Sequence, residues 1–204
     1  DAWNLDYDHV EAHVPVTGKP TRAPRSITKD SRRTTLELPL SVGKSRLRMR
    51  VSLAPHQCGA EIELDTTWRE DQVLLRAHFA TPIRAQRWTV GTQLGFVEWP
   101  THANTAIDEA RFEVPGQRWM DVSQPGRGVA ILDECKLGRS SGIGPNVTPG
   151  TGGSAHPGVQ LGLTLLRSPN FPDPTSDRGR HHLRYAIVVH DGDWRAAQVP
   201  ARAA

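Results

Sequence analysis

The 204-residue sequence predicts an all-β protein, a large antiparallel β-sandwich with little helix. Polar and apolar residues alternate over residues 34–40, 45–53 and 61–65. This pattern is typical of antiparallel strands that have one face on a core and the other in water. Short strand candidates separated by glycine and proline turns follow, as in sandwiches and barrels. The 16 prolines and 18 glycines leave no room for a long helix.

The clearest strand is 45–53, where four apolar side chains share one face and three arginines share the other. Short helices are expected near 105–110 and 193–198. Residues 11–33 and 138–158 are rich in proline and glycine, and we expect both to be surface loops. A loop as long as 138–158 without regular structure is either functional or disordered. The remaining predicted strands are 73–80, 84–91, 110–114, 118–123, 128–135, 159–167 and 182–190.

Composition excludes several classes of function. The net charge is +3, and its 25 basic residues are scattered among 22 acidic ones, so no basic stripe predicts a nucleic-acid partner. No apolar run approaches the roughly 20 residues of a membrane helix. Two cysteines, Cys58 and Cys135, make no disulfide framework. We expect two separate, buried or half-buried thiols in a reducing compartment, the cytoplasm of a bacterial-type cell.

The chain begins Asp-Ala-Trp-Asn-Leu-Asp, with no initiator methionine, basic start or apolar stretch. We therefore expect a piece of a longer polypeptide, without a signal peptide in this part. Gly43-Lys44-Ser45 resembles the end of a phosphate-binding loop, but Leu38 stands where the first glycine is needed. A hairpin turn is the expected structure there.

Histidines and carboxylates give only weak candidates for a site. His181 and His182 are adjacent on a predicted strand, so they point to opposite faces and cannot share a metal ion. The pair Glu61 and Glu63 lies on the polar face of a strand, and the pair Asp173 and Asp177 lies in a turn segment where Asp commonly closes the turn. We expect no metal site and no catalytic pair within this chain. Trp68, Trp88 and Trp119 lie within strand patterns and are expected in the core.

An ordered set of short segments resembles the C-terminal β-sandwich region of glycoside hydrolase family 38 α-mannosidases. Residues 95–105 read Gly-Phe-Val-Glu-Trp-Pro-Thr-His-Ala-Asn-Thr, close to the family's Gly-x-x-Glu-Arg-Pro-Thr-His-x-Asn-Thr, with Trp99 in place of Arg. The collinear matches cover nearly the whole chain. The others are Asp1–Asp6, Trp68–Glu70, Leu74–Arg76, Ala110–Pro115, Arg118–Ser123, Gly128–Gly138, Leu163–Pro169, Asp177–His181 and His190–Trp194.

The resemblance implies a galactose mutarotase-like super-β-sandwich that follows an N-terminal barrel and a helical bundle. Family 38 enzymes are retaining, zinc-dependent exo-α-mannosidases that act on α-mannosides and oligosaccharides, and their zinc and nucleophile lie in the barrel. None of those motifs matches a position here, so no catalytic or zinc-binding residue is assigned to this chain. The implied partners are the barrel, the bundle and the substrate; a homo-oligomer stays open.

The resemblance also implies that a loop of the sandwich reaches the rim of the sugar pocket. The matching segment runs through Lys136, Gly138 and Arg139, and we predict these three as substrate-binding residues. Arg139 would donate to sugar hydroxyls or to a carboxylate of the barrel. Two alternatives stay open: a surface hairpin in a purely structural scaffold, or a stand-alone, lectin-like carbohydrate-binding sandwich.

Overall fold

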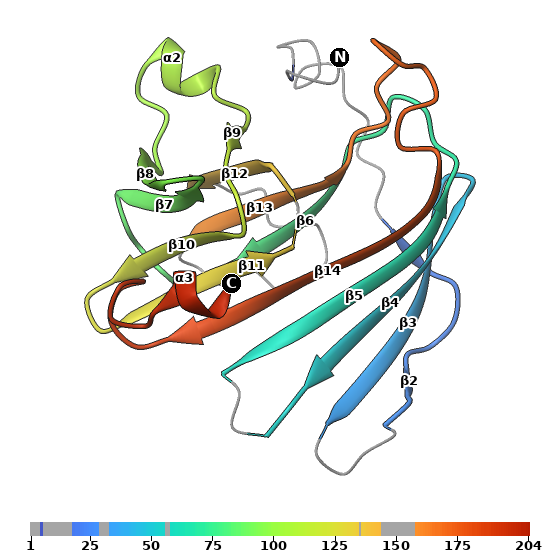
Figure 1. Ribbon diagram of the computed structural model, residues 1–204, viewed down its shortest axis with the longest axis horizontal. Coiled ribbons are helices and arrows are strands. Elements are labelled where there is room, and N and C mark those ends of the chain that lie inside the picture. The colour runs from blue at the N-terminus through green and yellow to red at the C-terminus, as the bar shows by residue number, and fades with distance from the viewer. Residues whose placement is uncertain (1–4, 6–17, 29–32, 56–57, 135, 144–157) are drawn as a thin grey trace. The chain divides into compact units, whose positions relative to one another are not determined.

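The computed structural model describes residues 5, 18–28, 33–55, 58–134, 136–143 and 158–204 (Figure 1). The chain divides into two compact units. Unit 1 holds residues 1–75 and 166–186, and unit 2 holds residues 76–165 and 187–204. One long strand, β14 (Gly179–His190), gives its first residues to unit 1 and its last four to unit 2.

Unit 1 is built on strands paired in the order β1-β3-β4-β5-β14, and β2 pairs with β3. The pairs β1–β3, β2–β3, β3–β4 and β4–β5 are antiparallel. The strands that precede β14 are β1 (Lys19–Pro20), β2 (Arg25–Ser26), β3 (Thr34–Val42), β4 (Ser45–Leu53) and β5 (Gly59–Trp68).

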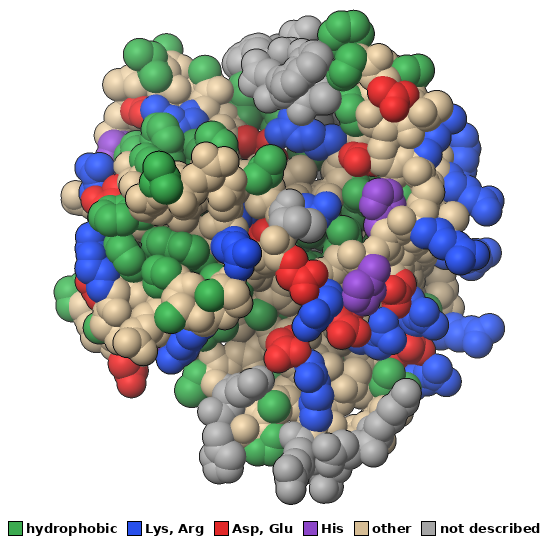
Figure 2. Space-filling view, in the orientation of Figure 1, with side chains coloured by type: hydrophobic (Ala, Val, Ile, Leu, Met, Phe, Trp, Pro, Cys, Tyr) green, Lys and Arg blue, Asp and Glu red, His purple; other side chains and the backbone are tan. Residues whose placement is uncertain are grey.

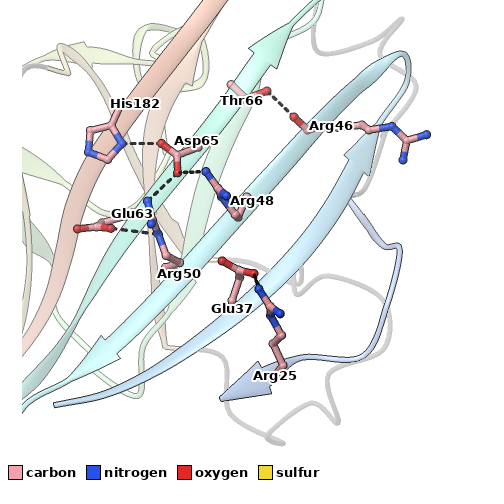
Figure 3. A network of polar contacts seen from close by, with 9 residues as sticks. All are labelled: Arg25, Glu37, Arg46, Arg48, Arg50, Glu63, Asp65, Thr66 and His182. Atoms are coloured by element: carbon pink, nitrogen blue, oxygen red, sulfur yellow. Dashed lines mark hydrogen bonds and ion pairs between the residues drawn. The ribbon is translucent and has the colours of Figure 1, made fainter. Parts of the chain in front are cut away.

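The two faces of this sheet differ as the alternation predicts. In register, Leu38 lies opposite Met49, which lies opposite Leu64, so apolar side chains form one face. The other face carries ion pairs such as Arg50–Asp65, 2.6 Å apart, and Arg25–Glu37, 2.8 Å apart (Figure 3). The period of two therefore separates core from solvent in unit 1.

A buried carboxylate closes the β3–β4 hairpin. Glu70 Oε1 accepts hydrogen bonds from the Lys44 amide at 2.8 Å and from Ser45 Oγ at 2.7 Å. Gly43 has φ +52°, and a side chain there would collide with the Glu70 carboxylate. Gly43 is therefore required both by its backbone conformation and by the close approach of Glu70, and the expected hairpin turn is confirmed.

Unit 2 contains strands of two antiparallel sheets. Its part of the first sheet has the order β14-β11-β10-β7-β8, and the second has the order β6-β13-β12-β9. Two one-turn helices, α2 (Ala106–Glu109) and α3 (Val199–Arg202), complete the described part of the unit. The strands are β6 (Leu75–Ala80), β7 (Arg87–Thr92), β8 (Gly95–Pro100), β9 (Val114–Pro115), β10 (Trp119–Gln124), β11 (Arg127–Asp133), β12 (Gly138–Ile143) and β13 (Val159–Leu166).

Both sheets give apolar side chains to the core of unit 2. Met120 and Ile131 lie opposite each other on β10 and β11, and both are fully buried. Leu161 and Leu163 on β13 are fully buried as well. The C-terminal segment adds Val199, which belongs to a buried cluster with Trp119. Complete removal of several large aliphatic side chains from water stabilises the unit, by about 1.5–3 kcal/mol for each.

The predicted fold class, an all-β antiparallel sandwich with little helix, is confirmed. The predicted strand 45–53 has the same bounds as β4, and the predicted core residues Trp68, Trp88 and Trp119 are at most 6% exposed. Cys58 corrects one expectation, because its thiol is free and exposed; Cys135 lies outside the described residues. Within the described ranges, no helix has the length and apolar character needed to cross a membrane.

The two expected surface loops have different outcomes. In 11–33, the described residues 18–28 are largely exposed, although they include the short strands β1 and β2. In 138–158, the first six residues are not a loop but the strand β12. Pairing with β13 on one side and β9 on the other supplies the hydrogen bonds that the sequence pattern does not reveal. Residues 144–157 lie outside the described part.

The buried Tyr185 phenol in β14 is expected to make the stability of the protein depend on pH at high pH. Burial raises the pKa of Tyr185 to about 12, against about 10 for an exposed tyrosine. An acid whose pKa is higher in the folded state loses stability as the pH rises from the unfolded toward the folded value. We therefore expect stability to fall between about pH 10 and the folded pKa of about 12. In a 295 nm titration, the difference between wild type and Tyr185→Phe should have a midpoint near 12; a midpoint near the exposed value of about 10 would contradict the burial.

Candidate functional site

The predicted rim segment connects the two sheets of unit 2. Asp133 ends β11, and its Oδ1 accepts a hydrogen bond from the Lys136 amide at 2.7 Å. Gly138 then begins β12 opposite Pro115, and Arg139 lies opposite both Val114 and Leu163. Asp133 therefore fixes the turn between the strands through the backbone, and Lys136 is left half-buried on that turn.

Arg139 points into the protein rather than toward solvent. Its side chain is 0% exposed, and Nη2 lies 2.8 Å from Asp133 Oδ2. The contact is an ion pair without hydrogen-bond alignment, since Nε, Nη1 and Nη2 have no hydrogen-bond partner among the described residues. Burial lowers the pKa of Arg139, and the Asp133 carboxylate opposes that shift. The guanidinium stays charged, because the arginine pKa starts far above neutrality, so the pair links the sheets inside the unit.

The sugar-contact role of Lys136, Gly138 and Arg139 stays a prediction. The structure places the Arg139 side chain inside the protein and not at the surface. A side chain with no exposed surface cannot donate to a ligand from where it lies. Arginine is among the residues most often exposed, which is why the sequence suggested a surface position. The structure places the Arg139 side chain against Gly116. A Cβ on residue 116 would lie 2.6 Å from Arg139 Nε.

A second polar cluster lies beside Gly138. The Glu113 carboxylate accepts a hydrogen bond from Thr164 Oγ1 and lies 3.4 Å from Arg76 Nη2. The same Arg76 nitrogen donates to Ser140 Oγ at 2.6 Å. A Cβ on residue 138 would lie 2.9 Å from both carboxylate oxygens of Glu113, so a larger residue there would have to displace that side chain. Sequence reasoning missed this cluster because its members come from separate elements and carry no common spacing.

One exposed imidazole borders the cluster. His78 on β6 is exposed, yet its protein surroundings and the nearby Arg76 lower its pKa below the ordinary value. At neutral pH the ring is therefore uncharged and offers one donor and one acceptor. The cluster brings a carboxylate and a guanidinium close together. The Glu113 carboxylate already contacts Thr164 and Arg76, however. Nothing in this geometry makes the Glu113 carboxylate a nucleophile or a general acid.

A buried histidine–aspartate pair lies elsewhere in unit 2. His190 Nε2 is 2.7 Å from Asp121 Oδ2, and the two side chains are 2% and 1% exposed. Ser123 Oγ donates to the other Asp121 oxygen. Burial raises the pKa of Asp121, while Ser123 and His190 partly offset this. Because the serine proton goes to the carboxylate and not to the imidazole, the trio lacks the serine-to-base contact of nucleophilic catalysis.

The carboxylate pairs considered from the sequence have structural contacts. Glu61 pairs with Arg33, and Glu63 Oε2 lies 3.2 Å from Arg50 Nε. The expectation of a solvated, charged strand face is confirmed for both. No group of three or more His, Cys, Asp or Glu side chains that could hold a metal ion occurs in the described part of the chain.

The second pair closes turns, as expected. Asp173 Oδ1 accepts from the Thr175 amide at 2.8 Å, and Asp177 Oδ2 accepts from the Arg167 amide at 2.7 Å. The adjacent histidines also have separate partners: His182 contacts Asp65, and His181 contacts the Asp177 carbonyl. The sequence Asn146-Val147-Thr148, a glycosylation sequon, lies outside the described residues.

Comparison with known proteins finds alpha-mannosidases that match most of this chain. Alpha-mannosidase 2C1 of Homo sapiens is 34% identical over 199 residues, which are 98% of this chain and 18% of that protein. Alpha-mannosidase G of Dictyostelium discoideum is 39% identical over 139 residues, which are 68% of this chain and 11% of that protein. The chain therefore spans less than a fifth of these relatives.

Solved structures agree on the fold. The crystal structure of an alpha-mannosidase from Enterococcus faecalis V583 superposes with a TM-score of 0.71 at 12% identity, covering 92% of this chain and 24% of that one. The family model described as "Glycosyl hydrolases family 38 C-terminal domain" matches residues 1–175. The resemblance of the ordered segments is thereby confirmed, and the chain belongs to the family of glycosyl hydrolase family 38 C-terminal domains.

Proposed function

We propose that this chain is the non-catalytic C-terminal β-sandwich of a retaining, zinc-dependent exo-α-mannosidase that acts on α-mannosides and oligosaccharides. The observation that carries the proposal is the family match over residues 1–175 of 204. The domain would support the catalytic barrel and helical bundle of the same polypeptide. The antiparallel sheets with buried cores suit a rigid support of this kind.

The chemistry of the proposed reaction would lie outside this chain. A retaining glycosidase forms a covalent glycosyl ester on a carboxylate and then hydrolyses it. In the parent enzyme, zinc would hold sugar hydroxyls in the barrel. The described side chains do not fit that ion, because they contain no group of three potential ligands. We therefore assign no step of the reaction to them.

We propose that this domain reaches the substrate only at the rim of the sugar pocket. Lys136 and Gly138 would meet the substrate, because they lie on the turn and first residue of β12 and are only half-buried. Arg139 would act as a positioning residue, since its ion pair with Asp133 holds the turn from inside. The exposed Cys58 thiol is compatible with a reducing, cytoplasmic location.

The proposal is tested on the full-length enzyme that carries this chain. Hydrolysis of 4-nitrophenyl α-mannoside should be lost on treatment with a chelator and restored by zinc, with retention at the anomeric carbon. A control in which the chelator is saturated with zinc beforehand should keep full activity. Turnover that survives complete metal removal, or an inverted product, would contradict the proposed class of enzyme.

One observation favours the alternative, a lectin-like module. Phe96 is 43% exposed, its ring lies 4.8 Å from that of Trp194, and the Arg195 guanidinium lies 4.2 Å from the Trp194 ring. Exposed aromatic rings offer an apolar body for stacking. Mannose binding by the 204-residue chain that Phe96→Ala abolishes would favour this alternative over a support domain.

A further inference from the structure

The apolar face of the unit 1 sheet is left partly uncovered along β3 and β4. In one row of register partners, Ile62 on β5 is 6% exposed, Val51 on β4 is half-buried, and Leu36 on β3 is 45% exposed. In the neighbouring row, Leu53 is 52% exposed and lies opposite Thr34. Exposure of apolar side chains therefore rises steadily from β5 toward β3.

The opposite face of the same strands shows what this sheet looks like where it meets water. Charged side chains of both signs and histidines mingle there (Figure 2). Many of them are held in pairs, such as Arg50 with Asp65 and His182 with Asp65 (Figure 3). Leu36 and Leu53, at 45% and 52% exposed, stand on the uncharged face of the same strands. Contiguous exposed apolar patches of this kind mark sites of interaction.

We propose that the β3–β4 face, defined by Leu36, Leu38, Met49, Val51 and Leu53, is the surface on which the preceding part of the parent mannosidase docks. This inference rests on the proposed function, because it assigns the supporting role to particular residues. The length of chain outside the structure favours this occupant: the chain is 18% of its human relative and 24% of the solved mannosidase chain it matches. The family model that matches describes a C-terminal domain, which favours an occupant from the part of the polypeptide that precedes such a domain.

The pairing of β3 decides the mode of docking. The outer edge of β3 is already paired, with β1 at Ser41 and Leu40 and with β2 at Glu37 and Leu36. Strand addition needs an open edge, and over these residues the edge is filled. At β3 itself a partner would therefore pack side chains onto the face, and the partner's surface would be apolar where it meets Leu36 and Leu53.

Cysteine protection in the full-length enzyme tests the docking surface. Leu36→Cys and Leu53→Cys are placed singly in a background with Cys58→Ser and Cys135→Ser, and labelling by a maleimide is followed peptide by peptide in a mass spectrometer. Each rate is divided by the rate of the same cysteine in the denatured enzyme. Leu94→Cys is the matched control, because Leu94 is a fully exposed leucine at a turn of unit 2.

Docking predicts that positions 36 and 53 react at least about tenfold more slowly than position 94, at every enzyme concentration. Equal rates at the three positions would overturn the proposal. Protection that disappears on dilution would show a second copy of the chain on this face and would also overturn it. Mannosidase activity is measured on the same samples. Unprotected cysteines in an active, zinc-dependent enzyme would refute the docking face and leave the proposed function standing.

Discussion

Replacing His190 by alanine is expected to lower the free energy of unfolding by about 3–5 kcal/mol. His190 Nε2 lies 2.7 Å from Asp121 Oδ2, and both side chains are almost completely buried. The substitution would leave the Asp121 carboxylate inside the protein, where Ser123 would still donate to its other oxygen. A buried polar group without its partner carries the full cost of its lost hydration.

The same strand provides the matched control. His182, also on β14, contacts Asp65 at the same distance of 2.7 Å, but its side chain is 51% exposed. Water replaces that contact when it is removed, so His182→Ala should change stability by at most about 1 kcal/mol. Both variants are measured by urea unfolding, with the slope compared to that of wild type. His190→Gln, which keeps a donor, should recover part of the loss. Similar small effects for both alanine variants would refute the account.

Arg139→Ala should cause a loss of similar size, about 3–5 kcal/mol. The substitution removes the cation 2.8 Å from Asp133 Oδ2 and leaves a cavity where a 0% exposed side chain stood. The double variant Arg139→Met with Asp133→Asn should recover most of the stability. Methionine fills the space, and the amide oxygen introduced at position 133 can still accept from the Lys136 amide. Buried ion pairs replaced as pairs are often neutral or better.

Activity of these variants in the full-length enzyme separates a positioning role from sugar contact. If Arg139 acts from inside, the double variant restores kcat/KM equally for 4-nitrophenyl α-mannoside and for extended mannosides. A stable double variant that is impaired only toward extended mannosides would show that the guanidinium leaves its buried position and reaches the sugar. A double-mutant cycle gives the coupling between residues 133 and 139. Coupling below about 0.5 kcal/mol would contradict the buried pair.

The period of two predicted the strands whose faces differ most in polarity. Residues 45–53 alternate without interruption, and β4 has those bounds. The strand β12 was missed because Gly138-Arg139-Ser140-Ser141-Gly142 contains no apolar alternation. It is a strand because β13 and β9 pair with it on either side. Such pairing depends on tertiary context that local propensity does not contain.

The candidate site was predictable only in part, for a related reason. The resemblance located residues 136–139, but polarity placed Arg139 at the surface. Its partner Asp133 ends the preceding strand, and only the crossing between the sheets brings the two charges together. His190 and Asp121 are 69 residues apart, so no local spacing could reveal their pair. Buried polar contacts between distant strands are a property of topology, which periodicity does not specify.

Hydrolysis of 4-nitrophenyl α-mannoside by the 204-residue chain alone, beside the full-length enzyme, tests the central claim most directly. We expect turnover by the full-length enzyme only, because the zinc and the nucleophile would belong to the part of the polypeptide outside this domain. Added zinc should not change the result for the 204-residue chain. Zinc-dependent turnover by that chain, persisting through repeated purification, would contradict its assignment as a non-catalytic domain.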